Sequence, residues 1–162
     1  MRKTLAIMAI LVLVLVGAAF GVEQTVSASV TVTQYVSVTI APCAGTLSFG
    51  GSVNPGTNDN PVACQGAGTA AINITNNAVS NKVIDVSTKG TNFNGTGGTI
   101  AIGQAEFDES NAKPSATTLT TAYLTSSTSV AVGSSAGIWY WLDIPSAQAA
   151  GTYTSTFSVK GE

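Results

Sequence analysis

One stretch near the start of the chain constrains the fold more than any other: VSASVTVTQYVSVTI, residues 26–40. Every second residue is apolar except Gln34, and the residues between them are serine, threonine and one tyrosine. This period-two alternation predicts an extended strand with one apolar face. Fifteen residues would extend over roughly 50 Å, whereas strands in globular domains are usually about 5–6 residues long. The stretch is therefore too long to serve as one ordinary strand.

The first 21 residues have the layout of a secretory signal peptide. Arg2 and Lys3 precede an uninterrupted apolar run over residues 5–16, and small residues follow. We expect this signal helix to be cleaved before Val22, so that the remaining 141 of the 162 residues are exported. An uncleaved anchor is the alternative, since residues 5–22 just reach the ~18 residues at which a membrane-spanning helix becomes feasible. The uncleaved signal segment would then be the only contact with a membrane.

The charge balance of the exported part excludes some classes of partner. It holds four lysines, no arginine, and eight aspartates and glutamates, a formal charge of −4. Without a basic patch, neither nucleic acid nor anionic lipid is an expected partner. Charged residues make up only 9% of the chain, so the surface is hydrated mainly by hydroxyls and amides. These features favour a secreted protein at the extracellular cell surface.

The sequence argues against an enzyme. It contains no histidine, which is the most common general base and a frequent metal ligand. The glycine-rich stretch at residues 95–98 lacks the Lys-Ser/Thr ending of a phosphate-binding loop. We expect no catalytic residue, no cofactor and no metal.

The cysteine content predicts one disulfide. Cys43 and Cys64 are the two cysteines of the chain, and a pair in an exported protein typically forms a disulfide. Closing a loop of about 22 residues would stabilise the fold by roughly 3 kcal/mol in the chain-entropy model. The alternative, a two-thiolate metal site, would leave the metal half-ligated because the chain has no histidine.

Short alternating segments, separated by glycine, proline and asparagine, recur about every ten residues after the long stretch. They are residues 46–49, 69–77, 82–90, 91–107, 119–137, 138–144 and 152–162. A hairpin is expected between 69–77 and 82–90. In the segment 138–144, one face is expected to hold Ile138, Tyr140, Leu142 and Ile144. The pattern predicts an all-β fold, a single jelly-roll or Greek-key-like β-sandwich over residues 35–162.

Two sequence features are candidates for surface chemistry. Asn73 in NIT and Asn94 in NGT are N-glycosylation sequons. Trp139 and Trp141 share the other face of the segment 138–144, where flat rings could stack on sugars. The alternative, which we favour, is burial or packing of both tryptophans, for instance in the core with Tyr140 and Leu142 facing out or into a subunit contact.

The long stretch is expected to divide at Gln34, which interrupts its apolar face. Residues 35–40 would then belong to the sandwich, whereas residues 24–33 have no assigned partner. An unpaired strand leaves its backbone groups and its valines in water, so it must pair with another strand. Either it pairs within its own domain, or residues 22–34 form a donor strand that enters another copy of the chain. The donor side chains would be Val26, Ala28, Val30 and Val32.

Three pieces of the sequence together resemble a known class of filament subunit. They are the signal segment followed at once by SASVTVTQYVSVTI, the text LSFGGSVNPGT, and the ending YWLDIPSAQAAGTYTSTFSV. In layout they are similar to archaeal bundling pilins and to the related TasA-like biofilm-fibre subunits. The resemblance implies a jelly-roll-like sandwich, a head-to-tail homopolymer joined by N-terminal donor strands, a glycosylated surface and a role in adhesion. The alternative function is a monomeric exported β-sandwich module that binds a cell-surface glycan or another surface partner.

Overall fold

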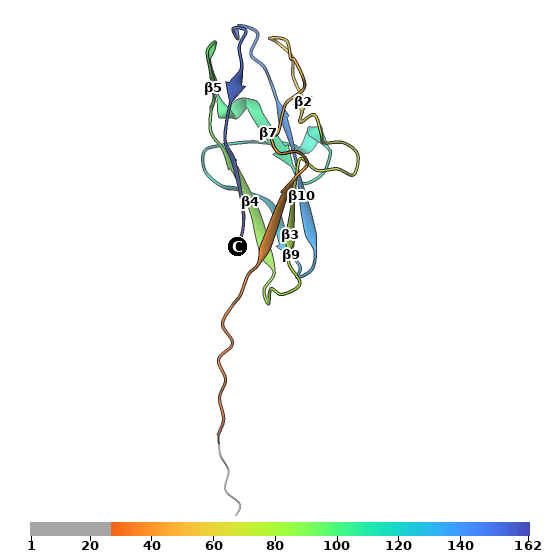
Figure 1. Ribbon diagram of the computed structural model, residues 1–162, viewed down its shortest axis with the longest axis vertical. Coiled ribbons are helices and arrows are strands. Elements are labelled where there is room, and N and C mark those ends of the chain that lie inside the picture. Colours follow the sequence, from red (N-terminus) through yellow and green to blue (C-terminus); the bar gives the residue numbers. More distant parts are fainter. Residues whose placement is uncertain (1–26) are drawn as a thin grey trace, which may run out of the picture. The chain divides into compact units, whose positions relative to one another are not determined.

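The computed structural model describes residues 27–162, and the chain divides into two units, Met1–Thr33 and Gln34–Glu162. The expected signal helix, residues 1–21, lies outside the described residues, as does Val26. In the first unit, residues 27–33 form neither helix nor strand. Every described strand belongs to the second unit, which is called the body below (Figure 1).

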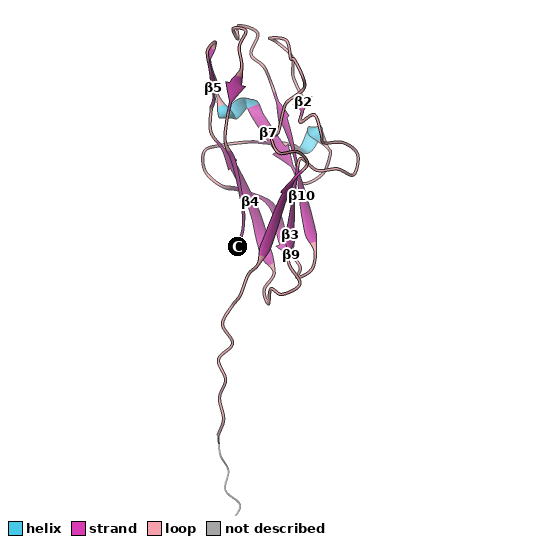
Figure 2. Ribbon diagram, in the orientation of Figure 1, coloured by secondary structure: helices cyan, strands magenta, loops and turns pink. Residues whose placement is uncertain are grey.

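The body consists of antiparallel sheets, which confirms the all-β prediction for the described residues (Figure 2). The largest sheet contains, in spatial order, β1 (Val38–Pro42), β3 (Ile72–Asn76), β10 (Ser135–Leu142), β7 (Ala105–Asp108) and β8 (Thr117–Thr118), with β2 (Asn60–Pro61) also paired to β10. The second sheet contains β12 (Phe157–Gly161), β4 (Ile84–Gly90) and β9 (Leu124–Val130). The third contains β11 (Tyr153–Thr154), β5 (Phe93–Gly95) and β6 (Gly98–Ile100).

The helices of the described part are two single turns of 3-10 helix, η1 (Ile102–Gln104) and η2 (Lys113–Ser115). No helix within residues 27–162 is long and apolar enough to span a membrane.

The three sheets contribute to one apolar core, and strand alternation decides which residues enter it. In β3, Ile72 and Ile74 are buried while Asn73 between them is exposed. The face predicted for the segment 138–144 is confirmed, because all four of its members are buried: Ile138, Tyr140, Leu142 and Ile144. The β4–β9–β12 sheet supplies the facing side, including Ile84, Val86 and Val130.

A buried tyrosine joins the two larger sheets. Tyr140 of β10 is fully buried, and its hydroxyl lies 2.6 Å from the hydroxyl of Thr88 of β4. Its ring stacks on Phe157 of β12, with 4.9 Å between the ring centroids. Burial raises the pKa of Tyr140 well above its ordinary value, although the hydrogen bond with Thr88 lowers it. The hydroxyl therefore remains neutral and fixes one sheet against the other.

The turn between β3 and β4 contradicts the predicted hairpin. β3 pairs with β1 and β10, whereas β4 pairs with β9 and β12, so the connection over residues 77–83 crosses from one sheet to the other. A short polar connection does not by itself distinguish a hairpin from such a crossing.

Buried Asn76 stabilises this crossing at one end of the body. Its side-chain amide donates hydrogen bonds to the carbonyl oxygens of Lys82 and Val130, both at 3.0 Å. Its backbone N–H donates to the Ser134 carbonyl, and its own carbonyl accepts from the Gly133 N–H. Asn76 thus joins the β3–β4 turn to the β9–β10 turn.

Two further expectations are met only in part. Of residues 46–49, only Phe49 makes a β-bridge, and that bridge to Val62 is isolated. The long N-terminal alternation contributes its residues 38–40 to the five-residue strand β1, and residues 27–37 are assigned to no strand. A strand requires a ladder partner, and alternation alone does not provide one.

The link between the sheets can be tested with Tyr140→Phe. We expect the free energy of unfolding to fall by about 1–2 kcal/mol, because the Thr88 hydroxyl loses its short buried hydrogen bond while the ring stacking is retained. Chemical denaturation would measure the change. Tyr123→Phe, at a partly exposed tyrosine, should leave stability unaltered, and equal stability of the two variants would show that the Tyr140 hydroxyl contributes nothing.

Candidate functional site

The proposed donor side chains lie in solvent wherever the structure describes them. Val30 is 88% exposed and Val32 is 77% exposed, and Ala28 is exposed as well. Val26 is outside the described residues. Residues 27–33, called the arm below, therefore present an apolar face that nothing described in the structure buries.

A set of hydrogen bonds fixes the backbone immediately after the arm. The Tyr35 N–H donates to Oδ1 of Asn81 (2.8 Å), and the Asn81 N–H donates to the Tyr35 carbonyl (3.0 Å). The Ser37 N–H donates to Oγ of Ser80 (2.9 Å), and that hydroxyl donates to the Ser37 carbonyl (3.0 Å). These contacts, called the root clamp, hold residues 35–37 on the β3–β4 turn. The arm thus joins the body at a defined point.

β1 is an edge strand with few free donors. The ladder bond from the Asn77 N–H to the Ser37 carbonyl shows that odd-numbered residues of this segment face β3. Val38 and Ile40 therefore direct their N–H and C=O groups to the free edge. Pro42 occupies the next such position and has no N–H, as is common for proline at sheet edges.

β12 is the corresponding edge of the second sheet, and it retains all its donors. Asp85 and Glu162 exchange both of their N–H···O bonds, at 2.9 and 3.0 Å, at the end of the β4–β12 ladder. Because bonded and free residues alternate, Phe157, Val159 and Gly161 direct their N–H and C=O groups outward. No described strand pairs with this edge.

The two edges approach each other at one end and separate at the other. A side-chain carbon added to Gly161 would lie 3.1 Å from Val38 and would also clash with Ile84, so glycine permits the close approach. Pro42 and Phe157, at the other ends of the same strands, both line an open groove. The gap between β1 and β12 thus widens into the groove.

The groove exposes part of the core. It has a volume of about 980 Å³, and its walls are residues 44–55 and 148–157. Core side chains also line it: Ile72, Phe93, Ile100, Leu142 and Ile144. Phe49 on one wall meets Phe93 and Phe157 edge to face, with centroid distances of 5.8 and 5.9 Å. A groove of this size is at the upper end for small-molecule sites.

The predicted disulfide is confirmed, and it closes the segment that forms one wall. Cys43 follows β1 directly and is bonded to Cys64, with 5.8 Å between their Cα atoms. The intervening chain has only the two-residue strand β2, so this covalent link limits how far residues 44–55 can move.

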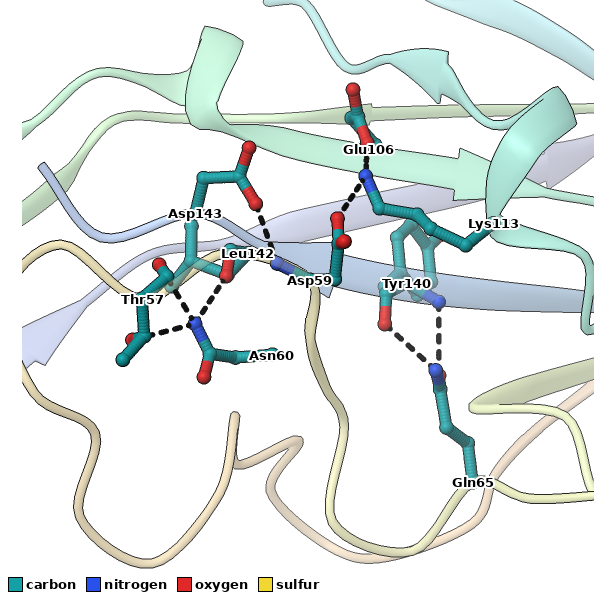
Figure 3. A network of polar contacts seen from close by, with 9 residues as sticks. All are labelled: Thr57, Asp59, Asn60, Gln65, Glu106, Lys113, Tyr140, Leu142 and Asp143. Carbon is teal, nitrogen blue, oxygen red and sulfur yellow. Dashed lines mark hydrogen bonds and ion pairs between the residues drawn. The ribbon is translucent and has the colours of Figure 1, made fainter.

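Side-chain amides hold the same segment against β10 (Figure 3). The Gln65 amide donates to the Tyr140 carbonyl (2.8 Å) and accepts from the Tyr140 N–H (2.9 Å), as a neighbouring strand residue would. The Asn60 amide donates to the Leu142 carbonyl (2.8 Å) and also to Thr57. These bonds replace the backbone ladder that a longer β2 would provide.

Charged residues complete this attachment. The Asp59 N–H donates to Oδ1 of Asp143 (2.7 Å), and Lys113 pairs with both Asp59 (2.8 Å) and Glu106. These groups are partly exposed, so each ion pair contributes at most about 1 kcal/mol. Within the part that the structure describes, no three acidic or cysteine side chains gather as a metal site.

The tryptophans and the sequons occupy different environments. Trp141 is buried, at 5% exposed, and Trp139 is half-buried, with its indole N–H donating to the Gly66 carbonyl (3.2 Å). Asn73 and Asn94 both face solvent. A surface contact through the tryptophans, and glycosylation at either asparagine, stay predictions.

A nucleophile-like spacing occurs in the β9–β10 turn. Residues 133–137 read GSSAG, which fits the Gly-x-Ser-x-Gly elbow of hydrolases, a strand–turn–helix motif. Here the serine of the motif, Ser135, begins a strand, and its hydroxyl lies 2.7 Å from that of Thr75. The chain has no histidine, the usual partner of the serine in that motif.

Comparison of the chain with protein-family models, with curated proteins and with solved structures finds no significant match.

The root clamp can be tested with Ser80→Ala. Removing the hydroxyl leaves the Ser37 N–H without its acceptor, so we expect its hydrogen exchange to accelerate about five- to tenfold, since such a bond contributes about 1 kcal/mol. Exchange of the β10 amides should not change. Ser52→Ala, at an exposed serine, is the control, and unaltered exchange at Ser37 in the Ser80 variant would contradict the clamp.

Proposed function

We propose that this chain is a secreted structural subunit of a cell-surface filament, assembled by donor-strand complementation and supporting adhesion. The observation that carries the proposal is that one molecule has both an exposed apolar segment and an unfilled apolar groove. The arm presents exposed Val30 and Val32 outside any strand, while the body has an open apolar groove beside a free strand edge. A strand from a second copy would satisfy both.

In this proposal the body is an incomplete jelly-roll or Greek-key-like β-sandwich whose missing strand lies along β12. That edge has three residues with both N–H and C=O free, and every β12 residue is only half-buried. The β1 edge is less suitable because Pro42 lacks a donor. The neighbouring arm would place Val26, Ala28, Val30 and Val32 toward the groove, where each could contribute up to about 2 kcal/mol before ordering costs.

The positions of the root clamp and the groove in the body favour head-to-tail assembly. The root clamp lies beside the β3–β4 turn, whereas the groove opens at the opposite ends of β3 and β12, near Ile72 and Phe157. Figure 1 shows the β3–β4 turn at the lower end of the body and the loops that flank the groove at its upper end. A contact between unlike ends leaves one free end on each copy, so it propagates as an open filament when its rotation does not close into a ring.

Export and surface modification fit the same proposal. Cleavage before Val22 would free the arm only after secretion, and the disulfide would form in an oxidising compartment. Exposed Asn73 and Asn94 would carry the glycans that the resemblance to archaeal bundling pilins implies. A monomeric glycan-binding module is the competing function, and sedimentation of the processed protein at increasing concentration distinguishes the two.

The arm can be tested on its apolar face alone. We expect Val30→Thr/Val32→Thr to raise the critical concentration for polymerisation at least about tenfold, because the hydroxyls lose burial energy in the groove while the strand preference is kept. Deletion of residues 22–33 should leave a folded monomer. Ser29→Ala/Thr31→Ala changes only the other face and should polymerise normally. Fibres that form equally well without the arm would refute donor-strand assembly.

The acceptor edge can be tested with two matched proline variants. Val159→Pro removes an outward N–H from β12 without breaking its ladder to β4, so we expect a folded monomer that cannot polymerise. Ile40→Pro makes the same change on the free edge of β1 and should still polymerise. The reverse result, read by electron microscopy and sedimentation, would assign the donor to β1.

A further inference from the structure

The exposed apolar residues of the body are not spread evenly over its surface. Six large hydrophobic side chains of the body are exposed, and four of them lie on or next to the connections at one end. These four, called the root-end patch, are Tyr35 (57% exposed), Val79 (68%), Val83 (52%) and Val132 (39%). The other two, Ile40 and Tyr123, lie in β1 and just before β9.

Hydrogen bonds show that the four residues share one end of the body. Asn81, between Val79 and Val83, is bonded through its side chain and backbone to Tyr35. Asn76 joins this turn to the β9–β10 turn, which carries Val132. The patch therefore rests on two turns that buried polar groups hold together.

The rigidity of these turns makes their exposed valines notable. Turn positions with no packing role commonly carry polar residues or glycine, and this chain is rich in serine, threonine and asparagine. Apolar side chains gathered on a fixed surface favour a protein contact over a solvated tip.

We infer that the root-end patch is a second contact between subunits, packed against the groove end of the next copy. This inference rests on the proposed function. The body begins at Gln34, next to Tyr35, so a copy whose groove holds the arm would lie next to this end of the body. The patch is thus continuous with the donor contact and needs no further partner to cover it.

The groove end of a second copy offers a suitable surface. Its rim carries small exposed apolar residues in two loops: Pro55, Ala149 and Ala150. One of these loops is fixed to the end of β10, because the Gly56 N–H donates to the Ile144 carbonyl and the Ile144 N–H donates to the Thr57 carbonyl (both 2.8 Å). Valines on fixed turns would therefore meet alanine and proline on fixed loops, with little entropy lost on contact.

Val79→Ser/Val83→Ser tests the inference in the full processed chain. Both side chains are exposed, so the variant should fold normally, and its hydrogen-exchange protection should match the wild type. We expect its critical concentration for polymerisation to rise about tenfold, with the arm sequence intact. Tyr123→Ser, at an exposed aromatic residue away from this end, should polymerise normally.

The outcomes separate this inference from the donor-strand proposal. If wild type polymerises, the arm deletion does not, and the double valine variant polymerises normally, the patch contact alone is refuted. If the arm deletion polymerises as well as wild type, or wild type stays monomeric, the donor-strand proposal is refuted and this inference with it.

A cross-linking experiment adds a readout that does not depend on polymer yield. Val79→Cys and Ala149→Cys are prepared separately, mixed during assembly and oxidised. The contact predicts a disulfide-linked heterodimer in the mixture, beyond what either variant forms alone. If homodimers form in either variant alone and the heterodimer is not enriched in the mixture, the root-end patch of one copy does not lie against the groove end of the next, and the inference is refuted.

Discussion

A strand at the edge of a sheet leaves half of its backbone groups without a ladder partner, and this constraint governs the architecture of the protein. The larger sheet ends in β1 and the second sheet ends in β12, and both edges border the same gap. Proline reduces the donors on the β1 edge, but β12 keeps the full set. The apolar core is consequently open along one side, where Phe49, Phe93 and Phe157 meet at the groove.

Two kinds of polar contact keep this open body rigid. Inside the core, the Tyr140 and Thr88 hydroxyls link the larger sheet to the second. At the surface, Asn76, Ser80 and Asn81 hold the turns together through their side chains. A body fixed in this way has little freedom to collapse over its own groove, and the proposed donor strand would benefit from such preorganisation.

Alternation in the sequence predicted the buried faces well, because one residue in two must enter the core. Ile72 and Ile74 are examples, and so is the face around Tyr140. Alternation did not predict the partner of each strand, so the hairpin between β3 and β4 was wrong. The burial of Trp141 agrees with the interpretation that the tryptophans pack rather than bind sugars, although this residue lies on the opposite face of β10 from the core-facing residues. In that region the segment carrying Asn60 and Gln65 covers β10 through side-chain amides.

The groove could not be predicted from the sequence for a related reason. One of its walls, residues 44–55, has no regular structure, and its position follows from the Cys43–Cys64 bond and from contacts with residues far along the chain. The two cysteines allowed the disulfide to be predicted, but not that the loop it closes would form a wall of the groove. The boundary between the two units, by contrast, falls next to a local feature of the sequence, because Gln34 is the one polar side chain on the apolar face of the long alternating stretch.

The attachment of residues 57–65 to β10 also sets a limit on how this chain can vary in length. Loops usually accept insertions, because few specific contacts depend on the number of residues between their ends. Here Asn60 and Gln65 must each reach a specified carbonyl of β10, with Leu142 and Tyr140 two residues apart. One residue added or lost between them would move an amide out of register, so this apparently irregular segment is as fixed in length as a strand.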